Sequence, residues 1–404
     1  MFDLAIVGAG PAGATLARLV GNRFRLILID RRRLSAPGAS GPGSLEKCCG
    51  GLVAPDAQRV LAEMGLGLPD SVLAGPQLFA VRSIDLDSGL ERFYQRHYIN
   101  IDREAFDRWL VSLVPGGVDV RDGCLLRGFT YEPGRGEAGD GGDAFTIRFT
   151  RNGRECVAQA RVLIGADGAD SRVRKLARGD DAGRRECRSY IAIQEWFRAE
   201  SPLPYFTAVF DSTITDFYGW TIPKDGCLLA GVAVEPGPAA LRRFDQFKRK
   251  LSDMGFDLSR PVKRCGAALL RPRGAGEIFP VVSMAGAAGD NPSPPGVALI
   301  GEAAGWISPS SAEGFSYAFR SAIAAAEALR AASRRAMPAA SEFRDQFLRG
   351  YRANCSSLRW NIRAKSLKSR IMYSPHLRKL IMKCGIGSIR ILDGSTSYAD
   401  RRAD

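Results

Sequence analysis

Histidine and metal-binding cysteine pairs are scarce in this sequence, and long apolar runs are missing from it. Only His97 and His376 occur among 404 residues, and the nine cysteines include no Cys-x-x-Cys pair, so no zinc-type ligand set can be assembled. No uncharged apolar stretch reaches the length of about 18 residues that a membrane-spanning helix needs. The first residues also lack the basic leader and apolar core of a secretory signal. We therefore expect a cytoplasmic protein without a metal site or a disulfide scaffold.

The composition is that of a globular protein with an excess of positive charge. Hydrophobic residues make up 45% and charged residues 25% of the chain, which excludes general disorder, and the length predicts two or three structural units. The formal net charge is +14. From Glu342 to Asp404 there are 14 Lys or Arg residues against 5 Asp or Glu residues, so most of the excess lies in the last sixth of the chain.

The first thirty residues carry the pattern of a dinucleotide-binding unit. An aliphatic segment, residues 3–7, runs into the loop Gly8-Ala9-Gly10-Pro11-Ala12-Gly13, and a segment of helical composition follows. In such a loop the first glycine allows a tight turn, the second lets the backbone approach a diphosphate, and the third lets the helix pack against the strand. A second apolar segment, residues 25–29, ends in Asp30, which can accept from a ribose hydroxyl. The pattern predicts a dinucleotide bound at the helix N-terminus.

Two further apolar segments end in turns that carry glycine and an acidic residue. Residues 161–165 lead into Ala166-Asp167-Gly168, and residues 296–300 lead into Gly301-Glu302, with Ser308–Phe315 after them. Three such turns spread over most of the chain indicate one long ligand. Their order resembles the FAD-binding module of the aromatic-hydroxylase-like flavoproteins, in which they are the dinucleotide loop, the DG motif and the GD motif. The resemblance implies bound FAD, and we expect it to be non-covalent because no histidine lies near the dinucleotide loop.

The resemblance also implies a set of cofactor contacts. Arg103 matches an arginine that precedes a helix in those flavoproteins, and Glu302 replaces the usual GD-motif aspartate with a longer carboxylate. No second Gly-x-Gly-x-x-Gly unit occurs, so the electrons must come from NAD(P)H at a transient site or from a separate reductase protein. The expected FAD-binding residues are Gly8, Gly10, Pro11, Ala12, Gly13, Asp30, Arg31, Arg103, Asp167, Gly168, Gly301, Glu302, Pro309 and Gly314.

The predicted fold class is α/β, with a Rossmann-type FAD-binding domain, an inserted antiparallel β-sheet substrate domain and a C-terminal helical segment. We expect residues 1–80, 101–178 and 278–335 to form the FAD-binding domain. Residues 81–100 and 179–277 contain strand-like segments and are expected to form the substrate-binding sheet, while residues 336–404 form the basic helical segment. The Gly-rich stretch 133–143 predicts a solvated hairpin loop, and residues 284–296 predict a second irregular segment.

A second resemblance concerns residues expected near the reacting part of the cofactor. Cys49-Gly50-Gly51 follows the first nucleotide unit, and Tyr218-Gly219-Trp220 precedes Pro223. Here the chain resembles the geranylgeranyl reductase family, which carries a Cys-Gly-Gly element and a Tyr-x-Trp-x-Phe-Pro element, although Ile222 stands where that family has Phe. The resemblance implies catalytic roles for Cys49, Tyr218 and Trp220. It also implies a substrate-binding set, which is Lys47, Gly50, Gly51, Tyr218 and Trp220.

The same residues have other interpretations. Cys49 is also typical of a small buried residue in a close turn. Tyr218 and Trp220, two apart on a strand, point to one face, which is either core or the wall of an apolar pocket. The segment is similar to the Trp-x-Trp-x-Ile-Pro motif of flavin-dependent halogenases as well. Those enzymes need a lysine near the flavin, and Lys47 is the only lysine in the first 174 residues.

Taken together, the sequence favours an FAD-dependent oxidoreductase that reduces C=C bonds of an apolar, prenyl or lipid-like substrate by hydride transfer from reduced flavin. The alternative is a flavin monooxygenase, or a halogenase, that acts on an aromatic or amino-acid-derived substrate through a flavin peroxide. Residues 358–383 mix apolar and basic side chains at helical spacing. This pattern predicts either a helix that covers the substrate domain or one that binds an anionic membrane surface; an electron-donor protein is a further expected partner, and nucleic acid is not.

Overall fold

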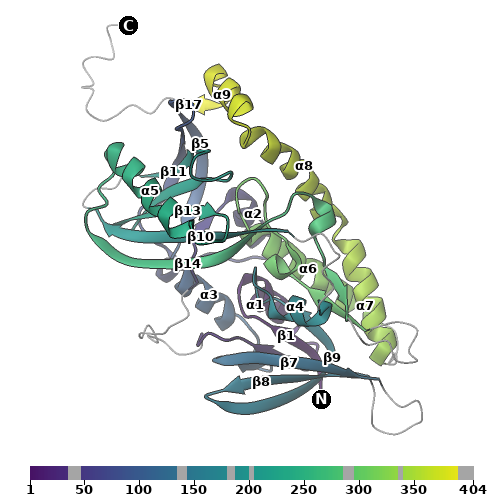
Figure 1. Cartoon of the computed structure of the whole chain (residues 1–404). Helices are drawn as coiled ribbons and strands as arrows, with labels where there is room; N and C mark the ends of the chain where they lie inside the picture. The colour runs from purple at the N-terminus through teal and green to yellow at the C-terminus, as the bar shows by residue number, and fades with distance from the viewer. Residues whose placement is uncertain are drawn as a thin grey trace. The chain divides into compact units, whose positions relative to one another are not determined.

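The computed structural model describes residues 1–34, 47–133, 143–179, 187–199, 204–284, 295–334 and 340–389, and its elements are labelled in Figure 1. The chain divides into two compact units, each assembled from separate stretches. The first unit contains residues 1–73, 101–190 and 267–369. The second contains residues 74–100, 191–266 and the chain from Arg370 onward.

The first unit is built on a mainly parallel sheet. Its order is β15 (Val281–Ser283), β16 (Gly296–Leu299), β9 (Arg154–Gly165), β1 (Phe2–Val7), β2 (Leu26–Ile29) and β6 (Asp119–Arg121). Strands β16, β9, β1, β2 and β6 run parallel, and β15 pairs antiparallel with β16. Strand β2 and the last four residues of β1 and of β9 are buried apolar runs, as expected for strand segments that are covered on both faces.

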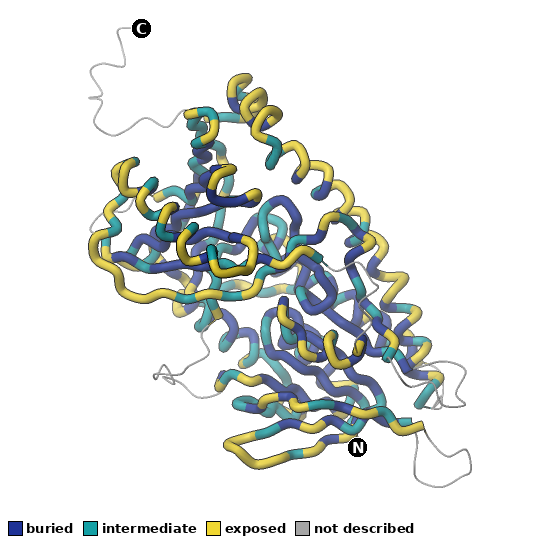
Figure 2. The backbone as a smooth tube through the Cα atoms, in the orientation of Figure 1, coloured by how far each residue is buried: buried dark blue, intermediate teal, exposed yellow. Residues whose placement is uncertain are grey.

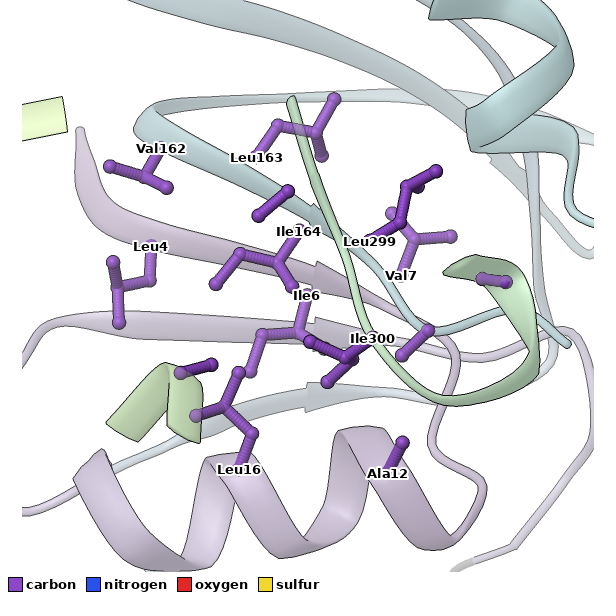
Figure 3. Packing of buried hydrophobic residues seen from close by; sticks show 14 of the residues in the cluster. Leu4, Ile6, Val7, Ala12, Leu16, Val162, Leu163, Ile164, Leu299 and Ile300 are labelled. Carbon is purple, nitrogen blue, oxygen red and sulfur yellow. The ribbon is translucent and has the colours of Figure 1, made fainter. Parts of the chain in front are cut away.

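Helices cover this sheet and seal the core of the first unit. Leu4 and Ile6 of β1 and Ile164 of β9 pack with Leu16 of α1 (Pro11–Val20), as Figure 3 shows. Helix α6 (Phe315–Ala332) packs against α1 and against α7 (Ala340–Asn354). The remaining helices of this unit are α2 (Pro55–Glu63), α3 (Arg103–Ser112), α4 (Arg172–Arg178) and most of α8 (Ser356–Met372). Three short 3-10 turns also belong to it: Asp70–Val72, Ala275–Glu277 and Gly301–Ala304. So does the two-residue strand β3 (Leu52–Val53).

A hairpin extends the first unit's sheet. Strands β7 (Cys124–Glu132) and β8 (Ala144–Arg151) pair antiparallel, and β8 continues antiparallel onto β9. The predicted hairpin around residues 133–143 therefore has its two strands in place, although most of the predicted loop lies outside the described residues. Most of the irregular segment predicted at 284–296 also lies outside them.

The second unit is a mostly antiparallel sheet with one long helix against it. The strand order is β14 (Pro261–Arg271), β10 (Arg188–Arg198), β13 (Cys227–Val234), β12 (Gly219–Lys224), β11 (Tyr205–Phe210), β4 (Leu78–Asp85), β5 (Leu90–Asn100) and β17 (Ser388–Ile389). Only β11 and β4 pair in parallel among the neighbours whose registers are known. Phe244 and Phe247 of α5 (Ala240–Asp253) pack into this unit's core. Asp225 and Gly226, both with positive φ, make the turn between β12 and β13.

The C-terminal helices do not form the separate segment that the sequence predicted for residues 336–404. Phe347 and Tyr351 of α7 and Leu358 and Ile362 of α8 are buried in the core of the first unit, so this unit runs to Ser369 and not to residue 335. Helix α9 (Pro375–Cys384) belongs to the second unit. The expectation that the whole segment covers the substrate domain is therefore wrong for α8, because its apolar side serves the other core.

Candidate cofactor site at the carboxyl edge of the parallel sheet

The three glycines of the dinucleotide loop have different surroundings. A Cβ atom built on Gly8, whose φ is +106°, would lie 2.4 Å from the carbonyl oxygen of Ala166, and one built on Gly13 would lie 1.8 Å from the carbonyl oxygen of Gly8. These two glycines are required by the packing of the loop itself. A Cβ on Gly10 would meet only the Arg32 guanidinium, at 4.0 Å. Gly10 thus leaves an open approach to the backbone, which is what a bound diphosphate needs.

The N-terminus of α1 faces the same place. Gly10 is its N-cap residue and Pro11 occupies its first turn. No side chain caps this helix end, and its first turn carries no acidic residue. A helix N-terminus presents backbone N–H groups and a partial positive charge, so it attracts an anion such as a phosphate. The chain's own residues at this turn therefore fit the diphosphate of a dinucleotide.

The second turn follows β9, next to β1 in the sheet. Gly168 has φ +83°, and a Cβ built on it would lie 3.6 Å from the Lys47 Nζ atom. Asp167 points to the start of α4, where its carboxylate accepts from the Ser171 hydroxyl and from the Val173 N–H at 3.0 Å. Burial raises the pKa of Asp167, although these hydrogen bonds oppose the shift. In this structure Asp167 fixes the turn and the adjoining helix.

The third turn follows β16 and reaches the dinucleotide loop. A Cβ on Gly301, whose φ is +57°, would lie 2.9 Å from the Ala12 Cβ atom, and the Glu302 carboxylate accepts from the Leu270 N–H at 3.3 Å. Farther on, the Pro309 carbonyl accepts from Arg271 Nε at 3.3 Å, and Gly314 is the N-cap residue of α6. Because β1, β9 and β16 are parallel neighbours, their three turns meet at one sheet edge.

A line of alternating charges, which we call the ionic chain, runs beside these turns through Asp30, Arg32, Asp107 and Arg103. The Asp30 carboxylate accepts from the Ala9 N–H at 2.6 Å and from Arg32 Nε at 3.2 Å. Arg32 Nη1 donates to Asp107 at 2.5 Å, and Arg103 Nε donates to the other oxygen of Asp107 at 2.9 Å. Burial alone would raise the pKa of the fully buried Asp107, but Arg103 and Arg32 hold it below its usual value.

Cys49 and Lys47 continue the ionic chain toward Gly168. The Cys49 sulfur accepts from the Gly51 N–H at 3.4 Å, and Cys49 is a free cysteine. Burial acts to raise the pKa of its thiol, but Arg103, the Gly51 hydrogen bond and Lys47 outweigh it, so the pKa is lowered. Burial and the Arg103 charge lower the pKa of the Lys47 ammonium, against the attraction of Glu302. The Cys49 thiol is therefore more acidic than a free cysteine thiol.

The structure brings together most of the residues that the sequence pointed to for the cofactor. The residues of the three turns belong to the first unit, and so do Asp30, Arg103, Cys49 and Lys47. Their contacts with FAD stay predictions. Asp30 already uses both carboxylate oxygens within the chain. Arg31 is exposed, and it is its neighbour Arg32 that enters the ionic chain.

The sequence did not identify Arg32 or Asp107. Asp107 lies four residues after Arg103 in α3, a spacing that pairs side chains on one helix face. The ion pair between Arg103 and Asp107 could therefore have been predicted from the sequence. The link from Asp107 to Arg32 spans 75 residues of sequence, and nothing local indicates it.

Tyr218 and Trp220 lie in the second unit, in an aromatic cluster made by Phe210, Phe217, Tyr218, Trp220 and Tyr373. The Tyr218 and Trp220 ring centres are 5.7 Å apart, and the Tyr218 and Phe217 ring centres are 4.8 Å apart. Trp220 lies against Gly231 of the neighbouring strand. Its indole nitrogen is buried without a hydrogen-bond partner among the described residues. Tyr373 is a member that the sequence gave no reason to expect.

The fold is shared with flavoproteins of known structure. The chain is similar to a geranylgeranyl bacteriochlorophyll reductase-like protein from Thermoplasma acidophilum, with a TM-score of 0.73 at 18% identity over 98% of this chain and 94% of that one. It is also similar to PqsL, a probable FAD-dependent monooxygenase from Pseudomonas aeruginosa, with a TM-score of 0.63 at 18% identity over 95% of this chain and 99% of that one. The myxobacterial halogenase CndH has a TM-score of 0.60 at 18% identity, over 89% and 81% of the two chains. The chain therefore has the α/β fold of FAD-dependent oxidoreductases.

Sequence comparison narrows this class to one family. Protein CbrA of Escherichia coli O6:H1 is 38% identical over 388 residues, which cover 96% of this chain and 94% of that protein. Protein CbrA of Shigella sonnei is 38% identical as well, over 96% of this chain and 98% of that protein. No family model matches the chain. The chain belongs to the CbrA family.

Proposed function

We propose that this protein is an FAD-dependent oxidoreductase that reduces C=C bonds of an apolar, prenyl or lipid-like substrate. The observation that carries the proposal is the meeting of three glycine turns at one sheet edge, where Gly10 is open and the N-terminus of α1 has no side-chain cap. FAD, reduced by NAD(P)H or by a reductase protein, supplies a hydride for one carbon of the double bond.

The other carbon of the double bond needs a proton, and the residues of the ionic chain together with Cys49 and Lys47 supply it. Cys49 is the donor, since a lowered pKa makes its thiol a stronger acid at neutral pH. Arg103 and Lys47 stabilise the thiolate that remains until water returns the proton. Asp107 holds Arg103 in place and balances its charge. One hydride and one proton then add across the double bond, and no other group leaves.

The aromatic cluster of the second unit supplies the apolar surface for the substrate. Its rings offer large contact area at fixed positions. The unpartnered indole N–H of Trp220 is available to donate to an oxygen of the substrate, because a buried donor gains from any acceptor that reaches it. The cluster is thus assigned to binding the apolar part of the substrate.

Lys47 supports a second candidate function, a flavin monooxygenase or halogenase. An amine of lowered pKa lies beside the Gly168 turn, and a lysine near the flavin is a feature of the halogenases that the Tyr218 segment resembles. In that case the reduced flavin would react with O₂ and the product would carry oxygen or halogen.

An anaerobic experiment separates the two functions. The protein with FAD is reduced by dithionite and mixed, without O₂, with geranylgeraniol as a prenyl probe. We expect the flavin to reoxidise and the product to gain two hydrogens. Consumption of O₂ that depends on an added aromatic substrate, with no anaerobic reoxidation by prenyl compounds, would assign the monooxygenase instead.

A variant of Cys49 tests its assignment as the proton donor. Cys49→Ser should keep FAD and its reduction by dithionite but lose most of the anaerobic reoxidation. Cys156→Ser, which changes another free and partly buried cysteine of the same unit, is the matched control and should behave like the original protein. Unchanged reoxidation in Cys49→Ser would reduce this residue to a packing role.

A further inference from the structure

Helix α9 contacts the second unit mainly through the charged side chain of Arg378, and most of its apolar residues do not take part. Arg378 and Met382 are its buried residues. Arg378 Nη2 donates to Asp85 at 2.8 Å and to Asp87 at 2.6 Å, and its guanidinium lies 4.9 Å from the Phe210 ring centre. Since Asp85 is fully buried, this pairing fixes which face of α9 turns inward.

The apolar residues of α9 consequently point to solvent. Leu377, Leu380 and Ile381 are 45%, 59% and 40% exposed, and Ile386 just after the helix is 71% exposed. The spacing of the first three places them on one helix face. A helix at a protein surface ordinarily buries such a face in its own core. An exposed apolar face of this kind marks an interaction site.

Helix α8 repeats the arrangement on the first unit. Leu358 and Ile362 enter the core, while Trp360 is 68% and Leu367 is 62% exposed. The Arg363 guanidinium lies 5.1 Å from the Trp360 ring centre. Figure 2 shows exposed residues along the outer side of both helices.

The charge of these helices selects the partner. Between Ser356 and Cys384 there are eight Lys or Arg residues and no Asp or Glu residue. Lys379 and Lys383 are exposed on α9, as is Arg363 on α8. Basic side chains beside exposed leucine, isoleucine and tryptophan are the composition of helices that lie in the interface of an anionic bilayer. A second copy of this chain would bring like charges together, which opposes self-association through the same face.

We propose that the exposed face of α9 binds the surface of an anionic membrane. Leu380 and Ile381 enter the headgroup region, and Lys379 and Lys383 contact lipid phosphates. Within the described part of the chain, no helix is long and apolar enough to cross a membrane. The proposal does not rest on the proposed function, because it needs neither substrate nor reduced flavin.

Co-sedimentation of the full chain with vesicles tests the proposal. Vesicles of phosphatidylcholine with phosphatidylserine should bind the protein, and vesicles of phosphatidylcholine alone should bind it much less. Binding should fall as salt rises, because surface charges are screened over about 8 Å at physiological ionic strength. Absence of binding to anionic vesicles at low salt would overturn the proposal.

Variants locate the binding face. Leu380→Ser with Ile381→Ser should weaken binding by about tenfold, because both side chains leave the interface. Leu241→Ser is the matched control, since Leu241 is a 56% exposed leucine on α5 of the same unit beside Arg242 and Arg243, and it should change nothing. Equal loss in both variants, or no loss in either, would contradict the assignment. Gel filtration tests whether a second copy of this chain covers the face instead of a membrane. If the original protein is a dimer and the double variant is a monomer, a second copy covers the face and the membrane proposal is overturned.

Discussion

The two units bury opposite kinds of side chain at the places where we expect ligands. In the first unit, the ionic chain sets two carboxylates and two guanidinium groups in line beside the glycine turns. In the second unit, five aromatic rings contact one another and one indole N–H has no partner within the described residues. Buried charges are tolerated only when they are paired and hydrogen-bonded. The first region therefore suits a charged cofactor held in one position, and the second suits an apolar substrate.

The proposed function divides these tasks between the two units. Each unit is assembled from segments far apart in the sequence. Experiments that disturb one region should leave the other intact if the division is real. The predictions below run from the largest expected effect to the smallest.

Breaking the ionic chain at its centre should have the largest effect on stability. Asp107→Asn removes the carboxylate that Arg32 and Arg103 share and leaves two buried cations without it, which should cost about 3 to 5 kcal/mol of unfolding free energy. Asp119→Asn breaks the partly exposed pair with Arg121 and should cost about 1 kcal/mol or less. Urea unfolding measures both variants. Equally small losses would show that the ionic chain adds nothing to the first unit.

The same carboxylate predicts a dependence on pH. The pKa of Asp107 is lowered in the folded chain, so its stabilisation is complete above the unfolded pKa of about 3.9 and is lost as the pH falls further. The stability difference between the original protein and Asp107→Asn should therefore shrink below about pH 4. A difference that stays constant through this range would mean that the charge of Asp107 is not what stabilises the fold.

A methyl group on Gly231 should disturb the aromatic cluster more mildly. Its Cβ would lie 2.5 Å from the Trp220 ring, and overpacking of this kind costs about 1 to 3 kcal/mol. Trp220→Phe makes room, so the double variant should lose less stability than the two single losses added together. Additive losses, measured by thermal unfolding, would show that the ring does not rest on Gly231. FAD content should not change in any of the three variants.

Removal of the Arg103 charge should change the reactivity of Cys49. Burial then acts on the thiol with less opposition, so its pKa rises. Alkylation of Cys49 by iodoacetamide, followed by peptide mass spectrometry, should move to higher pH in Arg103→Gln. Arg108→Gln on the same helix should leave the profile in place, because the charges that lower the pKa of the thiol are those of Arg103 and Lys47. An unchanged profile in Arg103→Gln would remove Arg103 from the site.

The sequence predicted the glycine turns because each one has a local cause. Gly8 and Gly13 stand where a side chain would collide with backbone, and such positions leave a readable spacing. The pairing of Arg32 with Asp107 has no local cause, since it arises only when β2 and α3 come together in the folded unit. The placement of α8 was missed for a similar reason. Its buried Leu358 and Ile362 fit either core by composition, and only the tertiary structure assigns them to the first unit.

The flavin content of Gly10→Val tests the central claim most directly. A Cβ atom at Gly10 meets no atom of the described residues closer than 4.0 Å, so the variant should fold like the original protein while its branched side chain blocks the diphosphate. Gly67→Val is the matched control, because a Cβ there meets nothing within 4 Å. We predict that the original protein and Gly67→Val carry FAD that heat or acid releases, and that folded Gly10→Val carries none. Full FAD occupancy in Gly10→Val, or an original protein that cannot bind FAD, would contradict the account.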